Sequence, residues 1–245
     1  MLAQLENPFM DKIGARVLPD FLNVTDDPTL TEIGGAPLFG TGKVDDEGVP
    51  TRQVKLVEAG RLKTLLTSRV PTRGLLKSTG SRHGGGPTPS NLLVTSTEGL
   101  TAEALKAELL KLVQQLGKEF GLLVRRVANP AFRTQRDQAS APNRESGRIE
   151  PAILVYKVFP DGHEELLRNV EVSGLTISAF KDIVAAGGDP FVYHTPFASG
   201  GIGRTPSSEL ISLAVPSLLF DDVTLKQPSG AIPKPPVAKH PFFDK

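Results

Sequence analysis

The stretch from 75 to 94, LLKSTGSRHGGGPTPSNLLV, places Arg82 and His83 directly before three consecutive glycines. Glycines let backbone N–H groups approach a ligand without obstruction by side chains, and an arginine beside a histidine can orient a carboxylate or a carbonyl. The alternative is a long turn between two β elements, because turns also need glycine. The residues alone leave both interpretations open.

A second stretch, VDDEG at 44–48, brings three carboxylates together before a turn. Adjacent carboxylates can share a proton or take a hard cation. Acidic residues before Gly48 and Pro50 are also ordinary loop residues that accept hydrogen bonds from nearby backbone N–H groups. The second interpretation is favoured.

Other chemical motifs are incomplete. GTGKV at 40–44 lacks the first glycine and the final hydroxyl of a phosphate-binding loop, and GGIGRTPS at 200–207 lacks the third glycine of a dinucleotide fingerprint. The sequence contains neither a G-x-S-x-G elbow nor an H-E-x-x-H helix. The four histidines are too far apart in sequence for local metal-ligand spacing; they are His83, His163, His194 and His240.

Composition excludes several classes of protein. The chain has no cysteine, which rules out disulfides, zinc–thiolate sites and a cysteine nucleophile. With 28 Lys and Arg against 27 Asp and Glu, the net charge is +1, so no basic footprint for nucleic acid or an anionic membrane exists. No apolar run approaches the ~20 residues of a membrane helix. We expect a cytoplasmic protein that contacts neither nucleic acid nor membrane.

The spacing of hydrophobic residues predicts the elements that position these loops. Residues 101–120 have apolar positions three and four apart, which predicts a helix with Thr101 as N-cap and Gly121 at C′. The segments TRQVKLVEAGRLKTLLTSR and AILVYKVFPDGHEELLRNVEV predict β-hairpins, and NLLVTS and GLLVRRVANP predict strands. TISAFKDIVAAGG predicts a short helix, and SSELISLAVPSLLFDDVTLKQ predicts two strands around Pro216. Residues 133–149 are expected to form a mobile loop, and 228–245 an extended proline-rich tail.

The order of four segments resembles a known family. They are VDDEGVPTRQVKLVEAGRLKTLLTSR, STGSRHGGGPTPSNLLV, GLTISAFKDIVAAGG and AVPSLLFDDVTL. Together they resemble the C-terminal part of the TldD/PmbA family, also called modulator of DNA gyrase or peptidase U62. The resemblance covers most of the chain, as one domain over residues 1–245. It implies an α+β, β-rich fold with a large twisted or barrel-like antiparallel sheet and two or three helices.

The resemblance also implies a function. Family members are implicated in the proteolysis and maturation of peptides, notably microcin precursors and antitoxins, and paired family proteins act as a complex. The hydrolytic member carries HExxxH on a helix upstream of the matched region and a cysteine further downstream, and neither occurs in this sequence. The glutamate of such a motif would polarise a zinc-bound water. We therefore expect no catalytic or metal-binding residue and no cofactor in this chain, with zinc supplied only by an N-terminal region or a partner.

Two hypotheses follow from the resemblance. In the first, the chain is the C-terminal domain of a metallopeptidase and forms the β platform of a peptide cleft, possessing a sheet edge to which extended peptides can add. Asp45, Asp46, Arg82 and His83 would then face the substrate, and the chain would form a homo- or hetero-oligomer with a family paralogue. In the second, it is a non-catalytic peptide-binding or assembly module that retains the fold. Direct DNA contact is a third possibility, which the near-neutral charge disfavours. The chain is expected to be a fragment, a split-gene product or a stand-alone descendant.

Overall fold

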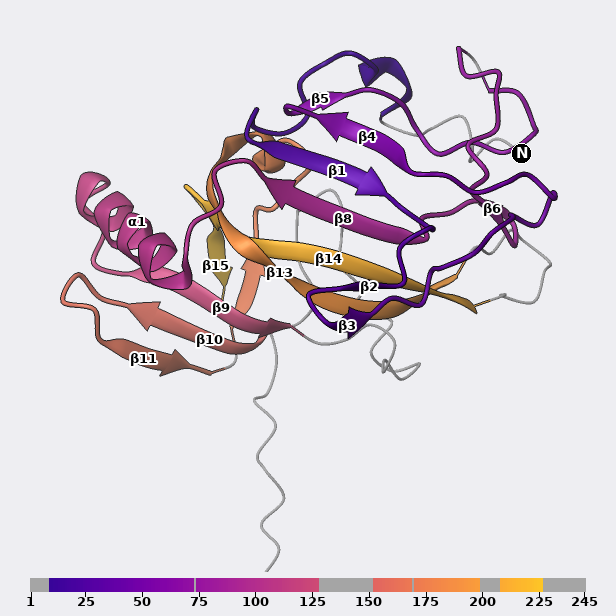
Figure 1. The fold of residues 1–245 in the computed structure, drawn as a ribbon. Coiled ribbons are helices and arrows are strands. Elements are labelled where there is room, and N and C mark those ends of the chain that lie inside the picture. The colour runs from indigo at the N-terminus through magenta and orange to yellow at the C-terminus, as the bar shows by residue number, and fades with distance from the viewer. Residues whose placement is uncertain (1–8, 73, 128–151, 169, 199–207, 227–245) are drawn as a thin grey trace, which may run out of the picture.

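The computed structural model describes residues 9–72, 74–127, 152–168, 170–198 and 208–226. One mixed sheet dominates it (Figure 1). Its six strands lie in the order β13 (Ile183–Ala198), β14 (Ser208–Phe220), β8 (Asn91–Ser96), β1 (Leu22–Asp26), β4 (Val54–Glu58) and β5 (Arg61–Leu62). All neighbours are antiparallel except β14 and β8, which are parallel. The predicted mainly antiparallel, β-rich sheet is therefore confirmed, but the sheet is open and does not close into a barrel within the described residues.

A smaller lobe lies to one side of this sheet (Figure 1). It contains the helix α1 (Ala102–Gln115) and a three-stranded sheet of β9 (Gly121–Val127), β10 (Ala152–Val158) and β11 (Glu164–Leu167). A Cβ on Gly121 would lie 2.8 Å from the Leu109 side chain and 2.9 Å from that of Val113. The apolar face of α1 therefore packs directly on the start of β9, and a side chain at residue 121 would have to displace Leu109 and Val113.

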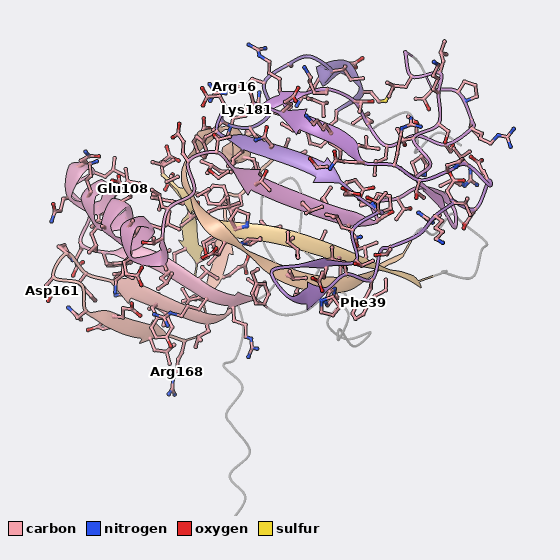
Figure 2. All side chains as sticks on the ribbon, viewed as in Figure 1. Arg16, Phe39, Glu108, Asp161, Arg168 and Lys181 are labelled. Carbon is pink, nitrogen blue, oxygen red and sulfur yellow. The ribbon has the colours of Figure 1, made fainter. Side chains whose placement is uncertain are left out.

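Short strand pairs complete the fold. β2 (Glu32–Ile33) pairs with β3 (Ala36–Pro37), β6 (Arg82–His83) with β7 (Gly86–Pro87), and β12 (Glu171–Ser173) with β15 (Thr224–Lys226). Two 3₁₀ turns cover Met10–Lys12 and Ala179–Asp182. The second turn is tied to the N-terminal part of the chain, because the Arg16 guanidinium donates a hydrogen bond to the Lys181 carbonyl (3.0 Å; Figure 2).

Two clusters of buried apolar residues contain side chains of the main sheet. One comprises Val17, Val57 and Leu62, and the other comprises Leu22, Ile183 and Ala186. Leu22 is fully buried, at 0 % exposure. The second cluster joins β1 to β13, which stand at different places in the strand order, so it holds the two halves of the sheet together.

The two predicted hairpins and the strands predicted at NLLVTS and GLLVRRVANP are confirmed. β4 and β5 are joined by Ala59 and Gly60, which both have positive φ (46° and 72°), as a two-residue hairpin turn requires. β10 and β11 pair through the turn at Gly162 (φ 88°). β8 and β9 match the strands predicted at NLLVTS and GLLVRRVANP.

The helix predictions need correction. The Thr101 hydroxyl does accept a hydrogen bond from the Ala104 N–H (3.2 Å), so the predicted N-cap is confirmed. The helix ends five residues before 120, and Gly117 (φ 59°), rather than Gly121, lies in the left-handed conformation at its C-terminus. The second predicted helix, TISAFKDIVAAGG, is only the 3₁₀ turn, and Ile183 already begins β13. One α-helix is therefore present in the described residues, instead of two or three.

The two strands predicted around Pro216 are one continuous strand, β14. Pro216 lies opposite Pro190 of β13. Neither proline has a backbone N–H that would be left without an acceptor. The ladder continues directly from Phe191 on one side, and on the other side it resumes at Ala186 after a shift in register. The loop predicted at 133–149 and the tail predicted at 228–245 lie outside the described residues.

Candidate functional site

The two loops singled out by sequence meet at one end of the main sheet. β6 and β7 form a small hairpin whose tip contains Gly84 (φ 56°), and Figure 1 places β6 near the end of the sheet where β8 begins. The VDDEG loop is closed by a bridge between Val44 and Pro50. The backbone N–H of Asp46 donates to the carbonyl of Arg82 (2.9 Å), which links the two loops directly. We call this pair of loops, 44–50 and 80–88, the two-loop site.

Asp45 organises both loops from a buried position. Its carboxylate accepts hydrogen bonds from the backbone N–H groups of Glu47 (2.9 Å), Val49 (2.9 Å) and Arg82 (3.1 Å), and the residue is 5 % exposed. Because this carboxylate accepts three backbone hydrogen bonds, its role is to hold the conformation of the two loops. This geometry agrees with the ordinary loop role that the sequence favoured for the acidic run.

Asp46 and His83 lie together on the more exposed side of the site. The Asp46 carboxylate accepts a hydrogen bond from the Gly84 N–H (2.6 Å), and its other oxygen lies 4.0 Å from His83 Nδ1. His83 Nε2 lies 3.5 Å from the Ser90 hydroxyl, at the outer limit of hydrogen bonding. The Asp46 side chain is 52 % exposed, so a ligand can reach its carboxylate, unlike that of the buried Asp45.

Arg82 points toward the third carboxylate of the run. Its guanidinium lies 3.5 Å from Glu47, whose other oxygen accepts a hydrogen bond from the Arg69 N–H (2.6 Å). All four residues predicted at the substrate therefore lie within the same pair of loops. Their role in binding stays a prediction.

Replacing Asp45 with alanine is expected to lower the free energy of unfolding by about 2–3 kcal/mol, because three backbone N–H groups lose a charged acceptor. The matched change Asp46→Ala removes one backbone hydrogen bond from an exposed position and is expected to cost less than about 1 kcal/mol. Urea unfolding monitored by circular dichroism measures both. Equal losses for the two variants would contradict the organising role of Asp45.

Beneath the two-loop site is a set of buried polar residues that sequence reasoning missed. Asn91 uses its whole side-chain amide: the NH₂ group donates to the carbonyls of Asp27 and Leu30 (both 3.0 Å), and the oxygen accepts from the Gly40 N–H (2.9 Å). Asn91 is 1 % exposed. It therefore ties the loop that follows β1 to the start of β8.

Ser212 of β14 makes the equivalent link on the other side of β8. Its hydroxyl accepts a hydrogen bond from the Phe39 N–H (2.8 Å) and lies 3.0 Å from His194 Nδ1. The His194 ring also packs against the Phe39 ring, with centroids 4.4 Å apart, and Figure 2 shows Phe39 at this end of the sheet. His194 is therefore a partly buried histidine with a hydrogen-bond partner inside the fold.

Asp26, at the end of β1, is the most unusual titratable group among the described residues. It is fully buried, one carboxylate oxygen accepts from the Ser90 N–H (2.8 Å), and the other has no hydrogen-bond partner. Burial raises the pKa of Asp26 to about 7, the adjacent Asp27 adds a smaller upward effect, and backbone hydrogen bonds from Ser90 and Asn91 oppose it. No spacing rule signals this residue, because DD before proline is an ordinary turn sequence.

The donor set for a metal is not assembled here. Among the described residues, no three His, Cys, Asp or Glu side chains lie close enough together to hold a metal ion. The described residues therefore do not assemble the donor set of a zinc site, and we derive no step through a metal. No helix in the described part of the chain is long and apolar enough to cross a membrane.

Comparison with known proteins identifies the fold. A family model described as the PmbA/TldA metallopeptidase C-terminal domain matches residues 2–227. The chain belongs to this family. A 69-residue segment is 44 % identical to Metalloprotease MJ0996 of Methanocaldococcus jannaschii, covering 28 % of this chain and 14 % of that protein.

Solved structures of longer proteins share the fold of this PmbA/TldD C-terminal domain. A protein of Thermotoga maritima described as a modulator of a DNA gyrase superimposes with a TM-score of 0.62 at 20 % identity, covering 92 % of this chain and 44 % of that one. TldE from Thermococcus kodakarensis gives 0.59 at 17 % identity, covering 91 % and 44 %. A modulator of DNA gyrase from Bacteroides thetaiotaomicron gives 0.55 at 20 % identity, covering 92 % and 41 %. The chain thus spans less than half the length of each matched protein.

Proposed function

We propose that this chain acts in the proteolysis or maturation of peptides, as the C-terminal domain of a TldD/PmbA-type metallopeptidase in the cytoplasm. The observation that carries the proposal is the match of the family model to residues 2–227. The domain would hold an extended polypeptide, while the metal and the general base come from another region or from a family paralogue in a homo- or hetero-oligomer.

The main sheet offers the geometry that such a role needs. Its edge strands in the described structure are β13 and β5. The backbone of β5 is already hydrogen-bonded to residues 14–17, whereas β13 has no further strand beside it apart from a bridge between Gly187 and Leu100. An extended peptide can pair its backbone with such an edge. The two-loop site, at the end of the sheet, supplies exposed polar groups such as Asp46 beside the platform.

The alternative is a non-catalytic peptide-binding or assembly module with the same fold. A binding and hydrolysis assay separates the two. We expect the purified chain to bind an unfolded, fluorescently labelled polypeptide, and to cleave it only when a full-length family member that carries HExxxH is added. Cleavage that stays at the level of the full-length member alone would favour the non-catalytic module.

Metal analysis provides the opposing control. The proposed division would be overturned if the purified chain held stoichiometric zinc and cleaved the polypeptide by itself, and if His83→Ala abolished both. The chemistry would then lie within this domain. Failure to bind any polypeptide would overturn both candidate functions.

A further inference from the structure

A cleft of about 380 Å³ lies beside the start of β4. One wall is the start of β4 with the residues before it. The other is formed by Thr64, Thr67, the residues 74–77 and Thr79. β5 pairs with Val57 and Glu58 of β4, and the Lys63 N–H extends this contact to the Leu56 carbonyl (2.8 Å). The first residues of β4 therefore face the cleft from a sheet edge that no strand of the described structure occupies.

The rim of the cleft is positively charged. Arg52, Lys55 and Lys77 line it, and no Asp or Glu does. Lys55 is paired with Glu58 (3.0 Å), but the Arg52 guanidinium donates to a neutral group, the Ser78 carbonyl (2.8 Å). Within the described residues, no carboxylate lies at ion-pair distance from Arg52 or Lys77. A carboxylate ligand would therefore not have to compete with a carboxylate of the described residues for either cation, although Arg52 is hydrogen-bonded to the Ser78 carbonyl.

The floor of the cleft is rigid and polar, and one side is apolar. Thr67 and Thr79 are buried and bonded to each other through the Thr67 N–H and the Thr79 hydroxyl (2.8 Å). The Thr79 hydroxyl lies 3.0 Å from that of Ser81, directly before β6. Leu75 and Leu76 form the apolar side, and Leu76 is 79 % exposed. A ligand that fits this lining carries carboxylates together with apolar groups.

We propose that this cleft binds an extended peptide segment that carries acidic side chains, paired along β4 and held at its carboxylates by Arg52 and Lys77. This inference rests on the proposed function, because it specifies which class of peptide the domain binds and where the peptide lies. A backbone edge supplies N–H and C=O groups for main-chain pairing, which a peptide satisfies and an oligonucleotide does not. The lining contains no aromatic side chain on which bases could stack.

The experiment compares labelled decapeptides in fluorescence anisotropy with the full chain. Each has leucine at alternate positions and Glu, Gln or Lys at the others, with acetylated and amidated ends, and a fourth Glu peptide keeps its free C-terminal carboxylate. We expect the capped Glu peptide to bind at least about fivefold more tightly than the Gln peptide at low salt, with the difference shrinking as ionic strength rises. N-methylation of alternate backbone nitrogens is expected to abolish binding, because it removes the pairing donors.

Two double variants locate the effect. Arg52→Gln with Lys77→Gln is expected to remove the preference for Glu while leaving binding of the Gln peptide within about twofold. Lys118→Gln with Arg126→Gln removes the same amount of charge from exposed positions in the smaller lobe and is expected to keep the preference. Circular dichroism verifies that both double variants are folded.

The outcomes separate the inference from the function on which it rests. Equal binding of capped Glu and Gln peptides overturns the acidic class and leaves peptide binding intact. A preference that survives the Arg52 and Lys77 substitutions overturns the location. Tight binding only of the peptide with a free C-terminus assigns the cations to a terminal carboxylate and overturns side-chain recognition, and tighter binding of an oligothymidine overturns a peptide ligand. If no peptide binds, the proposed function fails as well.

Discussion

Gly40→Ala is expected to destabilise the protein strongly, because it adds a methyl group to the buried polar region around Ser90 and Asn91. A Cβ at Gly40 would overlap the carbonyl group of Ser90 and lie 2.7 Å from the Asn91 side-chain oxygen. That oxygen accepts a hydrogen bond from the Gly40 N–H. The Ser90 carbonyl also accepts a hydrogen bond from the Ser212 N–H (3.1 Å), so moving it disturbs the contact between β8 and β14. Overpacking and a weakened buried hydrogen bond together cost about 3 kcal/mol.

Differential scanning calorimetry measures this loss as a fall in Tm of about 6–12 °C for a chain of this size. Gly42→Ala is the matched control, because a Cβ there would meet only the Val44 carbonyl oxygen, at 3.9 Å. The control is expected to leave Tm within about 2 °C. A Gly40→Ala protein as stable as the Gly42→Ala protein would show that the loop after β1 is not held against β8 as described.

Asp26 is expected to make the protein less stable as the pH rises from 4 to 8. Its pKa is about 7 in the folded chain, against the ordinary aspartate value of 3.8, so the folded state holds a proton that the unfolded state releases in this interval. The stabilisation from this proton is fully present below the unfolded pKa and is lost as the pH rises through the folded pKa. A separation of about three pKa units corresponds to about 4 kcal/mol in all, of which about 2–3 kcal/mol is lost between pH 5 and pH 8.

Asp26→Asn tests this dependence. The amide resembles the protonated carboxyl and cannot ionise, so the variant is expected to lose the decrease in stability between pH 5 and pH 8 and to exceed the natural protein at pH 8. Urea unfolding at both pH values measures the difference. Asp20→Asn changes an exposed carboxyl and is expected to retain the natural dependence. An unchanged slope in Asp26→Asn would assign the pH dependence to other groups.

The sequence predicted the parts of the fold whose signals are local. The apolar spacing and Thr101 located α1, and Gly60 and Gly162 located two hairpin turns. The mixed character of the sheet could not be predicted, because β8 and β14 are separated by more than a hundred residues and neither strand encodes its partner. The helix predicted near Ala179 failed for the same reason: pairing with β14 outweighs the local helical pattern.

The candidate site divides in a similar way. The order of the short motifs pointed to Asp45, Asp46, Arg82 and His83, and the structure brings these residues together. Asp26 carries no such signal, since its burial and its raised pKa come from what packs over it. The cleft beside β4 was also missed, because a sheet edge becomes visible only when the neighbouring strand is seen to end.

The parallel contact between β8 and β14 also bears on how this fold can be varied. The chain leaves the main sheet after β8, builds the smaller lobe and returns at β13. Its exit and return are fastened together, because the Leu100 N–H donates to the Ala186 carbonyl (3.0 Å) and the Gly188 N–H donates to the Leu100 carbonyl (2.9 Å). A segment whose two ends lie side by side on the rest of the fold is in effect an insertion. The smaller lobe can therefore be lengthened, shortened or exchanged without changing the strand order of the platform, which makes it the natural place for relatives with this fold to diverge.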